Sequence, residues 1–426
     1  MTISAWFAVA LAIPVLLLGE WLVRRVALLA RFNIPAPVVG GLLIALLVLG
    51  GNLAGWGKVS VASDVTAPWW TWLVTIEPQW LHTPARNVNQ PFLVAFFTCI
   101  GLNASWSLVR QGSWPLLLFL FLSALLAVAQ NLVGVPLAVL FDQPPLFGLV
   151  CGSLTLTGGV GTALGFAPEL EKAGLANAAV VSVAAATFGL VAGGLVGGPL
   201  GGWLIRRHQL KSDAPRNTSA ESAASSESGI LRDLGQLFLH GRRGLIHLLI
   251  LFACIKGGAW VSHFIQETHI TFPVYMGALL LGLVVRNLAD AFAGGAIRTE
   301  IVDTLASVSL GLFLAIAMMS LKLADLAHAA LPMLAILTAQ MILMGLFAWL
   351  VTFPLMGRTY DAAVMAAGQI GFGLGATPNA VANMKALVEK YGPAPRAFLI
   401  VPVVGGFLID FLNALNITAF LNFLKP

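Results

Sequence analysis

Two glycine-rich stretches, Gly152-Ser-Leu-Thr-Leu-Thr-Gly-Gly-Val-Gly-Thr162 and Gly368-Gln-Ile-Gly-Phe-Gly-Leu-Gly-Ala-Thr-Pro-Asn379, begin 216 residues apart in a chain that is otherwise almost continuously apolar. Irregular backbone at membrane depth leaves N–H and C=O groups that lipid cannot satisfy, so it persists only against protein or a water-filled cavity. We therefore expect the two stretches to line an internal cavity where a solute and an ion bind.

Composition places the chain in a membrane. Hydrophobic residues make up 58% of the 426 positions and charged residues 10%, and the mean hydropathy is +0.90. Such a chain cannot hide its apolar surface in one water-soluble core. The net charge of +5 comes from Lys and Arg in short loops, where membrane orientation requires them, so nucleic acid is not predicted as a partner. The three scattered cysteines predict neither disulfides nor a transition-metal site.

The apolar segments fall into two similar sets. Each set has five spans long enough to cross a bilayer, with a glycine-rich stretch before the last span. The predicted spans are about 3–23, 37–51, 91–109, 114–140 and 178–205, then 244–265, 272–285, 304–321, 331–353 and 397–423. This divides the chain into a first half, 1–205, with a break at about 146–166, a polar linker, 206–243, and a second half, 244–426, with a break at about 361–384.

A constant offset indicates an internal duplication. Phe97, Ile100 and Gly152 recur 216 positions later as Phe313, Ile316 and Gly368. Because five is an odd number of crossings, the second half must be inverted relative to the first. The expected fold is an all-α polytopic membrane protein built from two inverted-topology repeats of five transmembrane helices, each with a glycine-rich re-entrant hairpin.

The arginines give an orientation under this fold. If both glycine-rich stretches re-enter rather than cross, the arginines that flank the spans share one side; they are Arg24, Arg25, Arg31, Arg110, Arg206, Arg207, Arg286, Arg298, Arg358 and Arg396. The positive-inside rule makes that side cytoplasmic. We therefore expect both termini in the periplasm and the linker in the cytoplasm. A tryptophan-rich loop, 52–90, would then lie outside, at the membrane surface or at a protein contact.

The breaks carry chemistry suited to ions and carboxylates. Glycine permits a broken helix, whose ends offer N–H groups to anions and carbonyls to cations. Threonine hydroxyls add neutral oxygen ligands, and Pro378 removes a backbone donor. The other interpretation is that these glycines only let helices pack closely. Two hydroxyl- or amide-rich breaks at equivalent positions favour binding.

Polar groups inside the spans extend the candidate site. Asp410 with Asn413 three residues later puts an acid and an amide on one helix face, suited to an α-amino group or Na⁺ or to a structural pair. Asn103 suits a solute contact or an interhelical bond. Lys256 could neutralise a carboxylate of the solute, or pair with Asp410 or Glu20.

Long motifs make the chain resemble the glutamate:sodium symporter family. They are Ile-Pro-Ala-Pro-Val-Val-Gly-Gly-Leu-Leu (34–43), Ala-Phe-Phe-Thr-Cys-Ile-Gly-Leu-Asn-Ala (95–104), Ala-Thr-Phe-Gly-Leu-Val-Ala-Gly-Gly-Leu-Val-Gly-Gly-Pro (186–199), Leu-Pro-Met-Leu-Ala-Ile-Leu (331–337) and Gly-Phe-Gly-Leu-Gly-Ala-Thr-Pro (371–378). The resemblance implies Na⁺-driven glutamate uptake at the bacterial inner membrane, no cofactor beyond the coupling ion, and a homodimer with a moving transport domain.

We assign candidate residues on these grounds. The substrate set is Thr157, Gly158, Gly159, Gly161, Thr162, Gly373, Gly375, Thr377, Pro378, Asn379, Asn103 and Asp410. The sodium set is Thr155, Thr157, Gly371, Asn383, Asp410 and Asn413. The chain departs from the family pattern at Val160 and Gln369, where the resemblance implies histidines, and at Val180, where it implies an acid.

These departures leave the solute side chain open. One alternative is a Na⁺- or H⁺-coupled symporter of a di- or tricarboxylate. An alternative of another class is an intramembrane enzyme that uses Asp410 and Lys256 as acid and base, although the chain has no clustered second carboxylate or nucleophile motif. Dependence of competition on an α-amino group separates the first alternative, and a product distinct from the substrate would indicate the second.

Overall fold

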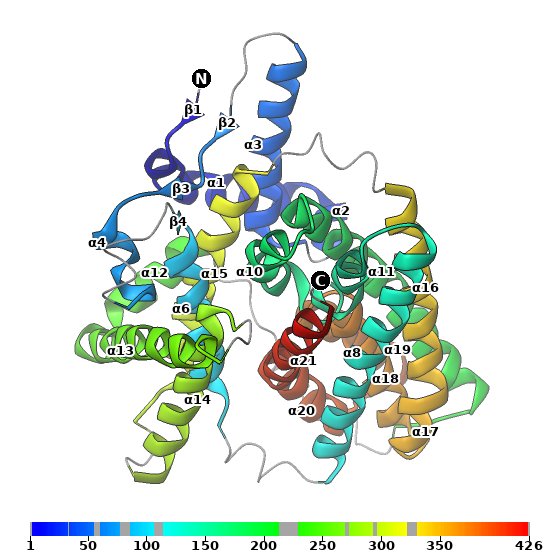
Figure 1. Ribbon diagram of the computed structural model, residues 1–426. Coiled ribbons are helices and arrows are strands. Elements are labelled where there is room, and N and C mark those ends of the chain that lie inside the picture. Colours follow the sequence, from blue (N-terminus) through cyan, green and yellow to red (C-terminus); the bar gives the residue numbers. More distant parts are fainter. Residues whose placement is uncertain are drawn as a thin grey trace. The chain divides into compact units, whose positions relative to one another are not determined.

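The computed structural model describes residues 2–32, 34–54, 60–76, 86–105, 114–212, 229–268, 272–292, 296–321 and 330–424. Almost all of these residues are helical (Figure 1). Within the described ranges, nine helical stretches are long and apolar enough to span a membrane. They are α1 (Ala5–Arg25), α3 (Ala36–Leu53), α8 (Trp114–Leu140), α11 (Ala178–Arg207), α13 (Gly241–Gln266), α14 (Val274–Phe292), α15 (Thr299–Met319), Ala330–Leu355 and Pro395–Leu424. The protein is therefore a polytopic, multi-pass membrane protein.

These nine helices coincide with nine of the ten predicted spans. The tenth prediction, 91–109, corresponds to the shorter helix α6 (Gln90–Asn103), and its expected end lies outside the described residues. Two of the nine stretches are composite. The first composite stretch, Ala330–Leu355, contains α16 (Ala330–Phe347), the π-helical turn η5 (Ala348–Thr352) and α17 (Phe353–Leu355). The second, Pro395–Leu424, contains α20 (Pro395–Val403), the π-helical turn η6 (Val404–Leu408) and α21 (Ile409–Leu424).

The helices form two compact units, and each unit takes its helices from both halves of the sequence. Unit 1 comprises the described residues within 1–30, 34–108 and 227–325; unit 2 comprises those within 31–33, 109–226 and 326–426. The 216-residue offset reappears in the helix boundaries. Helices α6 and α15 end at Asn103 and Met319, and helices α8 and α16 begin at Trp114 and Ala330. Equivalent segments of the two halves therefore fall in the same unit.

Unit 1 is built around α6, which packs against α14 and α15, while α1 packs against α3. Two small sheets join its N-terminal parts: β1 (Thr2–Ile3) pairs in parallel with β2 (Ser60–Val61), and β3 (Asp64–Val65) pairs antiparallel with β4 (Arg86–Asn87). The short helices α2 (Ala27–Arg31), α4 (Pro68–Thr71) and the 3₁₀ turn η1 (Trp72–Val74) complete the connections.

The tryptophan-rich loop packs onto the protein itself. Trp69 stacks on Trp6 of α1 with ring centroids 5.1 Å apart, and the Trp70 indole donates to the Val88 carbonyl at 2.8 Å. The Lys256 ammonium donates to the carbonyls of Trp72 and Thr75 at 2.9 and 2.7 Å. The loop therefore supplies oxygens to an intramembrane lysine, a role that the sequence analysis did not foresee. Trp56 and Trp80 lie outside the described residues.

The linker between the halves ends in a helix, α12 (Ile230–Leu239), that the sequence analysis missed. The Glu20 carboxylate accepts the Ile230 backbone N–H at 2.7 Å and lies 3.7 Å from the Arg24 guanidinium. Buried Asp233 accepts the Ser307 hydroxyl at 2.7 Å. Glu20 thus stabilises the start of α12 in the position of a capping acid. Residues 213–228 lie outside the described ranges.

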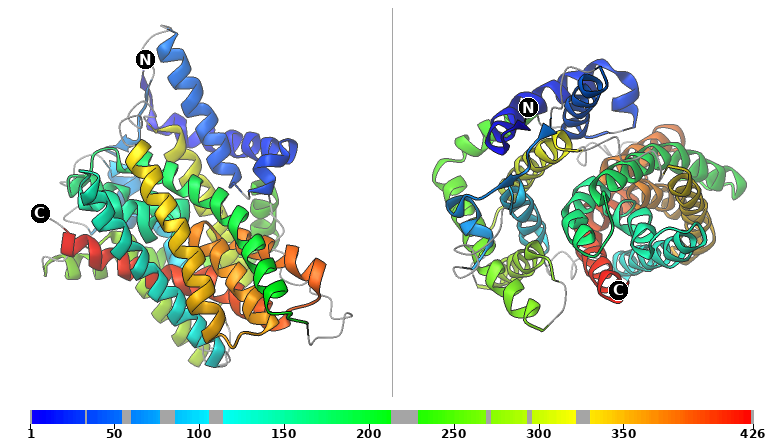
Figure 2. Two further views of the ribbon diagram at one scale, coloured as in Figure 1. Left: turned by 90° about the vertical axis from the view of Figure 1, so that its right-hand side faces the viewer. Right: turned by 45° about the horizontal axis from the view of Figure 1, so that its top comes forward.

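Unit 2 holds both glycine-rich stretches. From the first half it contains α8, α9 (Pro145–Leu149), the π-helical turn η2 (Val150–Leu154), α10 (Gly159–Lys172) and α11. From the second half it contains α16, η5, α17, α18 (Tyr360–Leu374), α19 (Thr377–Tyr391), α20, η6 and α21. In Figure 2 the red α21 and the cyan α8, nearly 300 positions apart in the chain, lie side by side, in agreement with their packing.

Candidate functional site

The first glycine-rich stretch forms a helix that breaks and restarts. Helix α9 runs into the π-helical turn η2, where Gly152 leaves helical geometry with φ −104° and ψ −138°. Helix α10 begins at Gly159, whose φ of +67° lies in the left-handed region. Glycine tolerates that conformation without the cost that a Cβ would bring. We call α9, η2 and α10 together the first break segment.

The polar backbone of the first break segment is satisfied by side chains from other helices. The Ser153 N–H donates to Asn131 Oδ1 of α8 at 2.9 Å, and the Ser153 carbonyl accepts Asn413 Nδ2 of α21 at 2.9 Å. Asn416 Nδ2 reaches the Ser153 hydroxyl at 3.3 Å. Thr155 Oγ1 donates to the Val150 carbonyl at 2.7 Å. These contacts replace the helical bonds lost at the break, as a buried backbone requires.

The second stretch breaks in the same manner. Helix α18 ends at Leu374, Gly375 takes φ −156° and ψ −83°, and α19 begins at Thr377 with Pro378 in its first turn. Proline suits that position because it needs no donor there. The Thr377 hydroxyl donates to the Gly405 carbonyl at 2.5 Å. We call α18 and α19 the second break segment.

Helix α11 holds the second break segment through two asparagines of α19. Asn379 Nδ2 donates to the Leu190 carbonyl at 2.8 Å, and Asn383 Nδ2 donates to the Gly193 carbonyl at 3.0 Å. The backbones approach closely here, because a Cβ added to Gly189 would lie 2.1 Å from the Leu374 carbonyl oxygen. Glycine at this position of α11 therefore serves close packing against the second break segment.

The two break segments meet inside unit 2. A Cβ on Gly159 would lie 3.1 Å from the Gly375 carbonyl oxygen. Gln130 of α8, fully buried, accepts the Thr157 hydroxyl on its Oε1 at 2.7 Å and donates from its Nε2 to the Gly373 carbonyl at 2.7 Å. One amide thus contacts the first break segment with one end and the second with the other.

Some polar groups of this region have no partner among the described residues. Oδ1 of Asn379 and Nδ2 of Asn131 are buried without a hydrogen bond. Asp410 is half-buried on α21, and none of the described hydrogen bonds or ion pairs engages its carboxylate. Gly158, Gly159 and Gly161 are partly exposed and Pro378 is exposed. An acceptor on the second break segment and a donor beside the first therefore remain available. The Asp410 carboxylate belongs to α21, the helix whose Asn413 contacts the first break segment.

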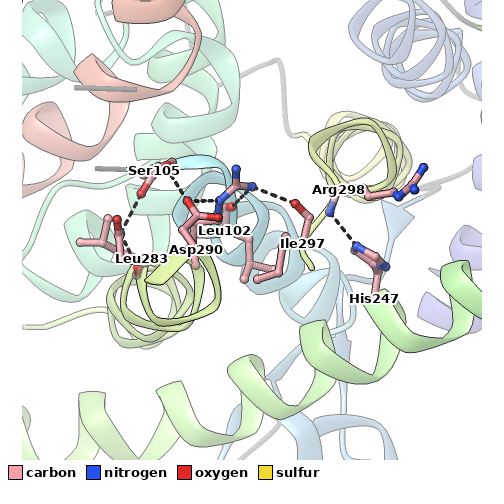
Figure 3. Close-up of polar contacts among 10 residues, drawn as sticks. Leu102, Ser105, His247, Leu283, Asp290, Ile297 and Arg298 are labelled. Atoms are coloured by element: carbon pink, nitrogen blue, oxygen red, sulfur yellow. Dashed lines mark hydrogen bonds and ion pairs between the residues drawn. The ribbon is translucent and has the colours of Figure 1, made fainter. Parts of the chain in front are cut away.

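All the predicted site residues except Asn103 belong to unit 2. Asn103 ends α6 in unit 1, where its Nδ2 donates to Asp303 at 2.7 Å, so it makes the interhelical bond that was the alternative interpretation. The neighbouring residue Ser105 donates to Asp290 at 2.5 Å, and Asp290 also accepts Nε of buried Arg286 at 3.0 Å (Figure 3). This polar network fixes the end of α6.

The three residues that the resemblance predicts to differ from the family pattern are buried. Val160 and Val180 are 5% and 4% exposed. Gln369 is fully buried, accepts the Thr352 hydroxyl at 2.5 Å and donates to the Ser123 hydroxyl at 3.4 Å. Both ends of the Gln369 amide are therefore used within the protein.

Sequence reasoning missed Gln130 and Asn131 of α8, of which Gln130 contacts both break segments and Asn131 the first. The signal was present, because two adjacent amides in the middle of a long apolar span are costly unless they bond to other polar groups. Lys256, which the sequence analysis considered for a carboxylate, instead contacts the carbonyls of the tryptophan-rich loop.

Comparison with known proteins identifies the family of the chain. The sequence profile described as "Sodium/glutamate symporter" matches residues 1–393. The chain is 37% identical over 422 residues to the sodium/glutamate symporter of Haemophilus influenzae, covering 97% of this chain and 96% of that protein. It is 40% identical over 410 residues to that of Escherichia coli, covering 95% and 94%. The chain belongs to the sodium/glutamate symporter family.

Proposed function

We propose that the protein carries L-glutamate into the cell together with Na⁺, and that solute and ion bind where the two break segments of unit 2 meet. Membership of a symporter family assigns transport rather than catalysis, with Na⁺ as the coupling ion and no cofactor. The observation that carries the location is the single buried amide of Gln130, bonded to both breaks, beside polar groups that lack partners.

The oxygens available at the breaks suit Na⁺. Thr155 and Thr157 donate their hydroxyl protons to other groups, so the lone pairs of both oxygens stay free to coordinate a cation. The unpartnered Asn379 oxygen and the carboxylate of Asp410 add further acceptors. A hydrated cation enters such a site only if several oxygens replace its water, and broken helices supply them in secondary transporters.

The same region offers donors for a carboxylate. The first N–H groups of α10 have no partner within the helix and carry its partial positive charge. The unpartnered Asn131 Nδ2 of α8 is a second donor beside the same break segment, because Asn131 Oδ1 accepts the Ser153 N–H. The solute's α-amino group would take the Asn379 oxygen or Asp410. In this proposal the cation and the anionic solute each lower the electrostatic cost of the other.

Alternating access would follow from movement of unit 2 against unit 1. Each unit is compact by itself, and all the candidate ligands except Asn103 travel with unit 2. The recurrence of helix boundaries at an offset of 216 supports a duplication. If both breaks re-enter rather than cross, each half has an odd number of spans and the second half is inverted. Both termini would be periplasmic and the linker cytoplasmic. The protein would act as a homodimer.

Transport is tested in proteoliposomes with radiolabelled glutamate and an inward Na⁺ gradient. Uptake should exceed the equilibrium level and collapse when K⁺ replaces Na⁺. Dicarboxylates that lack an α-amino group should compete weakly. Substitution Asn379→Leu, which removes the unpartnered oxygen, should lower uptake at least ~10-fold, since a lost buried hydrogen-bonding group costs about 1–3 kcal/mol. Uptake that is indifferent to the Na⁺ gradient would refute the proposal.

Orientation and assembly need separate measurements. A cysteine in place of Ser4, before α1, should react with a membrane-impermeant thiol reagent from the outside of intact cells. A cysteine in place of Leu239, at the end of α12, should react only after the membrane is opened. Both positions are clear of the three buried native cysteines. Native mass spectrometry should give twice the chain mass.

A further inference from the structure

Gln130 is a polar residue of unit 2 outside the predicted site whose side chain is bonded at both ends. Its Oε1 accepts from Thr157, its Nε2 donates to the Gly373 carbonyl, and its backbone carbonyl accepts Gln340 Nε2 at 2.6 Å. No part of it is exposed. A fully bonded amide inside a membrane protein is either a local stabiliser or a link between the parts that it joins.

The orientation of this amide is fixed by its partner in the second break segment. A carbonyl oxygen such as that of Gly373 only accepts, so the NH₂ end of Gln130 must face it. The oxygen end must then face Thr157, whose hydroxyl is forced to donate. Once that proton is committed, the Thr157 oxygen presents only lone pairs. The second break segment therefore sets the chemistry of a hydroxyl in the first.

We propose that Gln130 is a positioning residue for the coupling of Na⁺ to glutamate: it holds the Thr157 hydroxyl as an oxygen ligand for Na⁺ and transmits displacement of one break segment to the other. This inference rests on the proposed function and adds the residue that couples binding of the ion to binding of the solute. The planar amide keeps its oxygen and nitrogen at fixed separation, so a shift at Gly373 tilts the oxygen that Thr157 contacts.

Two variants separate the two parts of this role. Gln130→Leu removes both bonds at similar volume. Gln130→Glu keeps an acceptor for Thr157. Burial favours the protonated carboxyl, whose O–H can still donate to Gly373, so this variant is measured at a pH high enough to ionise it, where the carboxylate only accepts. The matched control is Gln340→Leu, which deletes another fully buried amide of the same size whose described hydrogen bond goes to the Gln130 backbone and not to either break segment.

The readouts are the Na⁺ concentration that gives half-maximal uptake and the Na⁺-dependent rise in melting temperature, each measured with and without glutamate. In Gln130→Leu, half-saturation by Na⁺ should rise about 10-fold or more, the size of a typical coupling between sites, and glutamate KM at saturating Na⁺ should change by less than about 3-fold. In Gln130→Glu, Na⁺ should still raise the melting temperature without glutamate, but glutamate should no longer strengthen that effect. Gln340→Leu should keep the wild-type pattern.

The following results would each contradict the inference. If Gln130→Leu keeps the wild-type Na⁺ dependence, or if it and Gln340→Leu change Na⁺ and glutamate parameters in the same ratio, the residue is only a stabiliser and the inference is wrong. If Gln130→Leu does not fold, Gln130→Glu decides: unchanged cooperation between glutamate and Na⁺ overturns the inference. A wild-type protein whose uptake ignores Na⁺ refutes the proposed function itself, and the inference falls with it.

Discussion

The contact between α11 and the second break segment gives the most exacting prediction. Gly189 lies on α11 against the end of α18, and a Cβ there would lie 2.1 Å from the Leu374 carbonyl oxygen. Atoms in ordinary contact are about 3.5 Å apart. Because the obstacle is backbone, no side chain can turn aside, and Gly189→Ala must push α18 and α11 apart by roughly 1.4 Å.

The free-energy cost of Gly189→Ala follows from the contacts that this separation breaks. The Asn379 to Leu190 bond, 2.8 Å long, would stretch beyond hydrogen-bonding distance and leave a second buried atom of Asn379 without a partner. Overpacking costs about 1–3 kcal/mol and an orphaned buried polar group about 1–3 kcal/mol. We expect a total of about 2–6 kcal/mol. That range corresponds to a loss of roughly 30-fold or more in the folding equilibrium constant.

The matched control lies on the same helix. A Cβ on Gly198 would meet nothing within 4 Å, so Gly198→Ala makes the same chemical change without the obstruction. Melting temperature in detergent and Na⁺-driven uptake are measured for both variants. Gly189→Ala should melt several degrees lower and lose most uptake, while Gly198→Ala should match the wild type. Equal behaviour of the two variants would show that α11 and α18 are not packed as described.

Three further predictions concern charged groups. Asp410→Asn should raise the Na⁺ concentration for half-maximal uptake about 10-fold, as loss of a ligand charge worth about 1.4 kcal/mol would; unchanged Na⁺ dependence would remove Asp410 from the ion site. Arg286→Met should lower stability by about 2 kcal/mol because it leaves the partly buried Asp290 carboxylate without its cationic partner, and the double variant with Asp290→Leu should recover part of the melting temperature; no recovery would contradict the pairing. Glu20→Gln should cost about 1 kcal/mol through the weakened start of α12 at Ile230, seen as faster proteolysis of the linker, whereas an unchanged digestion rate would argue against this cap.

Much of the fold was predictable from local pattern. Nine predicted spans coincide with nine helices, and both breaks fall where glycines cluster. Hydropathy reports the cost of placing each segment in lipid, which is a property of the segment alone. A glycine indicates where the backbone can leave helical geometry, which is likewise a property of that residue alone. Span ends were less accurate, as Gly241 and Phe292 show, because terminal turns continue beyond the apolar stretch.

Pairing between segments was not predictable in the same way. Nothing near Gln130 in the sequence indicates that Thr157 and Gly373 are its partners, and Asn103 gives no sign that Asp303, 200 positions away, is its acceptor. In each half of the chain, the first three spans belong to unit 1 and the last two to unit 2. This division also depends on packing between segments. The offset of 216 residues revealed the duplication, but it did not reveal which copies would pack together.

The contacts of the two breaks show why the site needs both halves of the chain. Asn413 of α21, in the last span of the second half, bonds to Ser153 in the first break segment. Leu190 of α11, in the last span of the first half, accepts from Asn379 in the second. Each break is thus held by the last span of the other half. Neither break can move without carrying its opposite span, so separate opening of one break would cost these buried bonds. Movement of unit 2 as a body would keep them all, and that difference favours carrying the site across the membrane intact.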